Sequence, residues 1–306
     1  MSDLLSPKLI PGFRGAVETW ECDQMLHMNV QFYMSKASAS FAHLQNALGL
    51  TPARIRKEKK ALAFQSLRIQ YKSEMRMGES MHGFSGIRSV SGDIVTGFIH
   101  LFDSRKNVLS GVYEFTARYT DLLSGEKLSL PAHVRDRAAA FVDEHSDQYL
   151  PAPMKCMIMP ATHLDHMFET SRSAVDVWEC DAYSNMEMQP IVGRFSDAAG
   201  HVMGRVGMTR EMQKERNLGS AALDYYTEFH SPVKVATSLI LKSALLDRKP
   251  KNFIFGHIMI NADTNKIVSN TTVLGCYFDM TARKSVPLPL EYMSIPEEQL
   301  LRFQLA

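Results

Sequence analysis

The pattern of apolar and polar positions predicts one long helix and a series of strands in the first half of the chain. Arg14–Trp20 is expected to form a short strand, and residues 29–48 a helix that ends before a glycine. Apolar side chains occupy most of the circumference of this helix, as expected for a buried helix. Further strands are expected at residues 63–71, 81–90, 93–102 and 108–120. The last is typical of a half-buried antiparallel strand, because Tyr113, Phe115 and Ala117 alternate with polar residues.

The same pattern returns in the second half of the chain. Residues 17–23, VETWECD, recur at 175–181 as VDVWECD, and these segments contain both tryptophans of the chain and two of its four cysteines. The offset of 158 residues persists until Pro131, which corresponds to Pro289, with one slip expected at the turn 103–107. Two copies of this size indicate a tandem duplication of one domain, because a solenoid needs at least three shorter repeats.

The duplication predicts an α+β chain of two domains that pack as a pseudo-dimer. We expect the first domain at residues 1–150 and the second at 151–306, with the connection at 131–160 and a helix within it at 134–145. The two tryptophans, one in each copy, are expected to anchor their strand against the core. Cys22 and its counterpart in the second copy are expected to be small buried packing groups.

Composition and missing motifs exclude several classes of protein. The chain has 34 Lys and Arg against 33 Asp and Glu, so its charge gives no sign of a nucleic-acid or anionic-membrane partner. No run of about 18 apolar residues predicts a membrane span. The four cysteines include no CxxC pair, which favours reduced thiols and a cytoplasmic protein. Gly-rich nucleotide loops, a nucleophile elbow and HExxH are absent from the sequence, and we assign neither a metal nor a cofactor.

Polar side chains crowd the junction between the first strand and the long helix. Asp23, His27, Asn29 and Tyr33 lie there within a few residues of one another. Asp and Asn are common N-cap residues, so capping explains one of them, but a cap does not need this many polar groups. Unpaired N–H groups at a helix start can stabilise an oxyanion, and a carboxylate beside them can act as base or nucleophile. The junction therefore predicts acyl transfer to water.

The stretch Asp23-x3-His27-Met28-Asn29-x3-Tyr33, set between a strand and a long helix that four strands follow, resembles the hotdog-fold thioesterases. The tandem copy resembles a double hotdog. The resemblance implies hydrolysis of the thioester of an acyl-CoA or an acyl carrier protein. It makes Asp23 the catalytic carboxylate, with His27 and Asn29 as helpers that orient the water or the thioester carbonyl.

The resemblance also implies where the substrate binds. It places the oxyanion donor among the N–H groups of the first helical turn, around residues 28–30. Met28, Val30 and Tyr33 are expected beside the substrate. CoA is then the handle of the substrate rather than a cofactor, and a homodimer of double hotdogs is compatible with the family. Members of the family often have glycine before the histidine, where this chain has Leu26.

The second copy departs from this motif. It keeps the aspartate as Asp181 but has Asn185 in place of the histidine and Glu187 in place of the asparagine. Pro190 is expected to interrupt the start of its helix. We favour a degenerate second copy, and one productive site per chain, over a second and different site formed by Asp181 and Glu187.

Two alternatives to thioester hydrolysis stay open. The hydratase branch of the hotdog fold also uses Asp and His, but its signature Asp-x-Asn-Pro-x-His is absent here. A hotdog protein that binds acyl thioesters without turnover is the other alternative. The basic segment 54–60, which has five basic residues in seven positions, would suit the phosphates of CoA or an acidic carrier protein, although a solvated charge run explains it equally simply.

Overall fold

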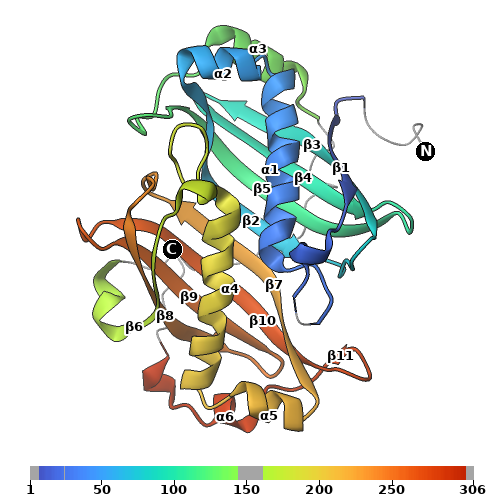
Figure 1. The fold of residues 1–306 in the computed structure, drawn as a ribbon, viewed down its shortest axis with the longest axis vertical. Coiled ribbons are helices and arrows are strands. Elements are labelled where there is room, and N and C mark those ends of the chain that lie inside the picture. The colour runs from blue at the N-terminus through green and yellow to red at the C-terminus, as the bar shows by residue number, and fades with distance from the viewer. Residues whose placement is uncertain (1–6, 24, 144–160, 301–306) are drawn as a thin grey trace. The chain divides into compact units, whose positions relative to one another are not determined.

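The computed structural model describes residues 7–23, 25–143 and 161–300 (Figure 1). The chain divides into two compact units. The first comprises residues 1–153 together with 181–189, and the second comprises 154–180 together with 190–306. The loop 181–189, which belongs to the second copy by sequence, thus groups with the first unit.

The first unit is an antiparallel sheet crossed on one face by a long helix (Figure 1). The strand order in this unit is β1-β3-β4-β5-β2. The elements are β1 (Ile10–Ala16), α1 (Val30–Ala47), α2 (Pro52–Glu58), β2 (Lys60–Tyr71), β3 (Ser80–Ser91), β4 (Ile94–Asp103), β5 (Val108–Asp121) and α3 (Ala132–Ala140). The helix expected within the connection is found as α3, and its expected residues beyond 143 lie outside the described part of the chain.

The second unit has the same construction. Its strand order is β7-β10-β9-β8-β6, with the short β11 beside β10. The elements are β6 (Phe168–Ala174), α4 (Met188–Arg205), α5 (Arg210–Glu215), β7 (Leu218–Phe229), β8 (Ser238–Arg248), β9 (Asn252–Asn261), β10 (Ile267–Asp279), β11 (Lys284–Ser285) and α6 (Leu290–Met293). Short 3-10 helices complete the chain at Thr19–Glu21, Ala161–His166, Val177–Glu179 and Glu297–Gln299.

The duplication holds at the level of single residues. Helices α1 and α4 begin and end exactly one offset of 158 residues apart, as do β1 and β6 and also β2 and β7. The slip expected at the turn 103–107 is wrong, because Asn107 (φ 54°) and Asn265 (φ 53°) hold the same left-handed position in the two turns. The neighbouring bulges also match, since the strand registers skip Ser110 in one copy and Val268 in the other.

The segment before the long helix differs from its prediction. The strand is Ile10–Ala16 rather than Arg14–Trp20, and Trp20 lies in the 3-10 turn that follows it. Trp20 and Trp178 are 73% and 79% exposed, so the prediction that they anchor their strands is wrong. The turn is held instead by the glutamate that follows each tryptophan, which pairs with a basic residue of the long helix.

Helix α1 is buried on one side and half-buried around most of the rest, with exposed residues only at 42, 43 and 46. Met34, Ala37, Phe41 and Leu44 are buried, whereas His43 is exposed. On the buried side the rings of Phe41, Phe64 and Phe115 form a compact cluster between the helix and the sheet. This layer fixes the helix on the sheet and so fixes the position of its N-terminus.

A candidate active site at the strand–helix junction

A buried ion pair fastens the junction to helix α1. The Nζ atom of Lys36 lies 2.5 Å from Oε1 of Glu21, whose other oxygen accepts a hydrogen bond from the Glu18 amide. The Glu21 residue is only 5% exposed. The Glu21 carbonyl oxygen in turn accepts from the Asn29 amide at 2.8 Å. One glutamate therefore connects the 3-10 turn, the start of α1 and the second turn of α1.

The second copy has the equivalent ion pair, with an arginine in place of the lysine. Arg194 donates to both carboxylate oxygens of Glu179, at 2.9 and 2.8 Å, and also to the Ser173 hydroxyl. Side-chain hydrogen bonds from Arg194 lower the pKa of Glu179, although burial opposes this. Sequence reasoning missed both pairs. The signal was present, since the glutamate recurs in both WECD segments and a basic residue recurs at one position in both helices.

The Asp23 carboxylate shapes the loop before α1. Its Oδ1 accepts from the amides of Met25 at 2.8 Å and His27 at 3.3 Å. Its own amide donates to the His27 carbonyl at 2.8 Å, which closes the loop. The tight turn places Leu26 in the left-handed region with φ 59°, where a glycine would be unstrained. Among the described residues, Oδ2 of Asp23 has no hydrogen-bond partner.

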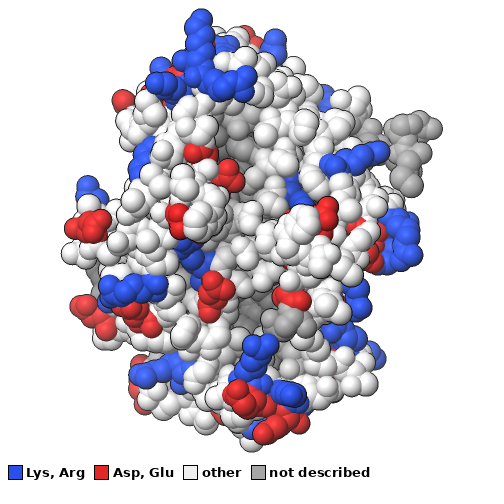
Figure 2. Space-filling view, viewed as in Figure 1, with Lys and Arg blue, Asp and Glu red and all other residues white. Residues whose placement is uncertain are grey.

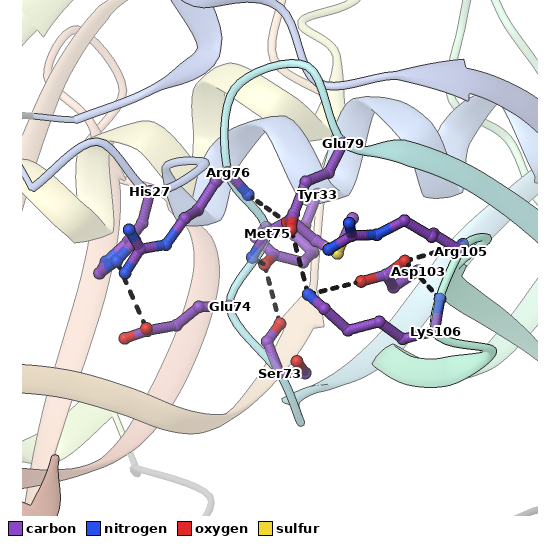
Figure 3. A network of polar contacts seen from close by, with 10 residues as sticks. All are labelled: His27, Tyr33, Ser73, Glu74, Met75, Arg76, Glu79, Asp103, Arg105 and Lys106. Atoms are coloured by element: carbon purple, nitrogen blue, oxygen red, sulfur yellow. Dashed lines mark hydrogen bonds and ion pairs between the residues drawn. The ribbon is translucent and has the colours of Figure 1, made fainter.

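His27 lies beside Glu74, which is in the loop between β2 and β3 (Figure 3). Its Nε2 lies 3.4 Å from Oε2 of Glu74, which is 45% exposed. The backbone supports this placement, because His27 bridges to Arg76 and the Met28 amide donates to the Met75 carbonyl at 2.8 Å. The structure thus brings Glu74, which sequence reasoning did not single out, next to the predicted histidine.

Asn29 caps helix α1. Its Oδ1 accepts from the Gln31 amide at 3.1 Å, which leaves the Nδ2 group outside the cap. Of the three amides expected as oxyanion donors, those of Met28 and Asn29 already donate to carbonyls of the chain. The Val30 amide, the first of the helix, donates to no acceptor within the described part of the chain. It is therefore the amide of this turn that is left for a ligand.

Tyr33 holds the loop that carries Glu74. The side chain is buried, and its hydroxyl donates to the Ser73 carbonyl at 3.0 Å and accepts from the Met75 amide at 2.9 Å (Figure 3). Burial raises the pKa of this phenol, so it stays protonated. The hydroxyl predicted to lie beside the substrate is thus occupied by backbone groups in this structure.

A second anchor fixes the far end of the same loop. Lys106 lies between Oδ2 of Asp103 at 2.9 Å and Oε1 of Glu79 at 3.0 Å, and Glu79 also accepts from the Arg76 amide (Figure 3). Burial alone would raise the pKa of Asp103, but hydrogen bonds from Lys106 and from the Arg105 amide hold it below its usual value. Both ends of the loop next to His27 are therefore held.

The loop before α4 has the same aspartate turn, but both carboxylate oxygens of its aspartate accept hydrogen bonds. Oδ1 of Asp181 accepts from the amides of Tyr183 and Asn185, and Ser184 has the left-handed φ of 64°. In contrast to the first loop, Oδ2 of Asp181 accepts from Nδ2 of Asn185 at 3.2 Å. Partial burial and, after it, the charge of Asp181 raise the pKa of Glu187.

Pro190 does not interrupt the start of α4, which was expected from the sequence. The helix begins at Met188, so Pro190 lies in its first turn. Amides at this position have no acceptor within the helix, and the missing N–H of proline costs little there.

Cys22 is half-buried rather than buried, as is Cys180. Each thiol lies next to the carbonyl oxygen four residues earlier, at 3.7 Å for Cys22 and 3.4 Å for Cys180. Desolvation and then the negative charge of Asp23 raise the pKa of Cys22. A raised pKa disfavours the thiolate, which argues against Cys22 as a nucleophile.

Basic side chains gather over α2 (Figure 2). Arg56 and Lys57 are exposed in the last turn of this helix, whereas Arg54 pairs with Glu58 at 2.8 Å. No helix in residues 7–23, 25–143 and 161–300 is long and apolar enough to cross a membrane. The described residues also contain no cluster of three or more His, Cys, Asp or Glu that would hold a metal ion.

The fold and the site together define a double hotdog, in which a polar loop precedes the long helix in each of two tandem copies. The chain belongs to the thioesterase-like superfamily, whose family model matches residues 17–138 and 175–300. Membership of this superfamily indicates a thioester hydrolase and supports hydrolysis of acyl thioesters in general. No curated protein matches the sequence.

Solved structures share the fold over most of the chain. A putative oleoyl thioesterase from Lactobacillus plantarum aligns with a TM-score of 0.66 and 10% identity, over 88% of this chain and 96% of that one. The 12:0-ACP thioesterase from Umbellularia californica gives 0.66 and 8%, over 89% and 95%. An acyl-ACP thioesterase from Bacteroides thetaiotaomicron gives 0.64 and 10%, over 88% and 98%. At these identities the likeness shows the double-hotdog fold.

Proposed function

We propose that this protein hydrolyses an acyl-CoA thioester to the free acid and CoA, with Asp23 as the catalytic carboxylate. One observation carries the assignment. The two loops use Oδ1 of their aspartate in the same way. Oδ2 of Asp181 accepts from Asn185, whereas Oδ2 of Asp23 has no partner among the described residues. The shared bonds explain why both copies need an aspartate, and the unbonded oxygen distinguishes the one that can take a proton.

The proposed chemistry uses groups that the fold leaves unpaired. Asp23 takes a proton from a water whose oxygen bonds to the thioester carbonyl carbon, and the negative charge moves to the carbonyl oxygen. The Val30 amide donates to that oxygen. When the C–S bond breaks, its electron pair leaves with sulfur, and the CoA thiolate takes the proton from Asp23. Direct attack by the Asp23 carboxylate, followed by hydrolysis of the anhydride, is the nucleophilic version of the same role.

His27 and Asn29 are proposed as positioning residues. The Asn29 cap uses only Oδ1, so Nδ2 remains to donate to the carbonyl or the water. Glu74 beside Nε2 orients the His27 ring. Met28 and Val30 line the substrate in this proposal, whereas Tyr33 acts indirectly through the loop that it holds.

The test compares asparagine variants of the two aspartates. Asp23→Asn keeps the Oδ1 acceptor, so we expect an unchanged thermal midpoint but a loss of about 100- to 10,000-fold in thiol release from acyl-CoA substrates. Asp181→Asn is the matched control and is expected to change turnover little. Equal losses in the two variants would contradict a single productive site.

The same samples distinguish the alternatives. Hydration of an enoyl-CoA without thiol release would assign the protein to the hydratase branch. Binding of acyl-CoA without either reaction would make it a non-catalytic acyl-thioester protein. Thiol release only from an acyl carrier protein would show that the carrier protein, and not CoA, carries the acyl group of the substrate. The cytoplasm as compartment and a homodimer as assembly remain proposals based on the sequence.

A further inference from the structure

The second unit contains a cavity between α4 and its sheet. The cavity has a volume of about 50 Å³. Its lining exchanges rings with the first copy. The clustered Phe41, Phe64 and Phe115 correspond, 158 residues later, to Ala199, Ala222 and Val273, and all three of these smaller residues line the cavity. Conversely, Phe195, Phe253 and Phe255 line the cavity where the first copy has Ala37, Val95 and Gly97. The two copies therefore pack this space differently.

The cavity has an apolar floor and a partly exposed rim. Phe195, Phe253 and Phe255 are buried beneath it, whereas Ser220 is exposed and Ala222 is half-exposed. A small ligand can therefore approach from the rim and bury an apolar end on the aromatic floor. The volume is about a third of the roughly 150 Å³ that admits benzene, which favours a short chain over a ring.

A buried histidine lies in the wall of the cavity. His257 lines the cavity and is 1% exposed, and its first-copy counterpart is Ile99. Its Nδ1 atom lies 2.7 Å from the Ser243 hydroxyl, which lies 2.6 Å from the Thr170 hydroxyl. Thr170 in turn donates to the Leu241 carbonyl at 3.2 Å.

This chain of hydrogen bonds favours one tautomer of His257. Each hydroxyl has one proton, and Thr170 gives its proton to Leu241. The arrangement that satisfies all of these groups has Ser243 donating to Thr170 and accepting from Nδ1–H of His257. The other ring nitrogen, Nε2, carries a lone pair and has no partner among the residues that the structure describes. Burial lowers the pKa of His257 to about 3, so the ring is neutral at neutral pH.

We propose that this cavity binds a short aliphatic group that carries one hydroxyl, with the carbon chain on the aromatic floor and the hydroxyl donating to Nε2 of His257. The site is independent of the proposed function of the first loop. It gives the second copy a binding role, although the loop of that copy lacks the histidine and asparagine of the first.

The test uses two probes of similar size, 1-propanol and 1-fluoropropane, of which only the alcohol can donate a hydrogen bond. The full-length protein is labelled with 13C at methionine methyl groups and with 15N at histidine. Met203 lines the cavity, and Met34, buried in the first unit, is the internal control. We expect saturable shifts at Met203 only, affinity for the alcohol about two- to tenfold higher, and a shift of the His257 Nε2 resonance with the alcohol alone.

Three variants decide the outcome. Ala222→Leu fills the cavity and should abolish the Met203 shifts, and Val273→Leu serves the same purpose if the first variant does not fold. His257→Ile, the first-copy residue, should make the two probes bind equally. No saturable shift in the wild type, or shifts that survive filling, would overturn the site. A preference for the alcohol that persists without His257 would overturn the assigned acceptor.

Discussion

Removing the charge of Lys36 tests whether a buried ion pair holds the candidate active-site loop. In Lys36→Met the side chain keeps a similar length, but Glu21 loses the ammonium 2.5 Å from its Oε1. The two side chains are 10% and 7% exposed, so water does not replace the lost partner. The carboxylate keeps its hydrogen bond from the Glu18 amide. Lys36→Met therefore leaves a charge that is buried and poorly compensated.

The expected cost follows from that burial. Breaking one side of a buried pair costs about 3–5 kcal/mol of unfolding free energy. We expect about 3 kcal/mol, because the Glu18 amide remains, and about 6–12 °C in the unfolding temperature of the affected unit. Removing both charges in Glu21→Gln with Lys36→Met should cost less than Lys36→Met alone, because no buried charge is then left.

Guanidinium unfolding followed by circular dichroism measures these differences. Arg172→Met is the control, since it breaks the exposed Arg172–Glu169 pair and should change the free energy of unfolding by at most about 1 kcal/mol. Arg194→Met in the second copy should cost more than Lys36→Met, because Arg194 also donates to Ser173 and to backbone carbonyls. A loss below about 1 kcal/mol for Lys36→Met would refute the argument from burial.

Three further predictions concern the loops around the site. Leu26→Gly should raise the free energy of unfolding by about 0.5–1 kcal/mol, measured by calorimetry. The change removes backbone strain of about 1–2 kcal/mol at the left-handed position and adds the smaller entropy cost of a glycine in the unfolded chain. A decrease in the free energy of unfolding would contradict this. Tyr33→Phe should lower stability by about 2 kcal/mol and speed hydrogen exchange of the Met75 amide, since that amide and the Ser73 carbonyl lose their partner; unchanged exchange would show that the hydroxyl does not hold the loop. Asp103→Asn should destabilise the protein at pH 7 but much less below about pH 4. The pKa of Asp103 is lower in the folded than in the unfolded state, so its charge stabilises the fold above the unfolded-state pKa, and this contribution is lost as the pH falls through the folded-state pKa. A destabilisation in urea unfolding that does not change with pH would refute the role of the charge.

The sequence by itself determined the architecture. The repeat of the WECD segment gave the offset of 158 residues, and periodicity placed the long helix and the four strands that follow it within a few residues of their observed bounds. These features are local, because helix and strand patterns depend on neighbouring residues. A duplication is visible as identical residues at a fixed spacing. The polar junction was also visible as a local cluster around Asp23.

The tertiary structure alone decided which groups meet. It placed Glu74 beside His27 and Lys36 beside Glu21, left one oxygen of Asp23 unbonded, and turned Trp20 outward. It also showed a cavity in the second copy, whose lining loses three rings of the first copy and gains three at other positions. Such outcomes depend on contacts between residues far apart in the chain and on how completely side chains fill the space between layers, neither of which a local pattern records.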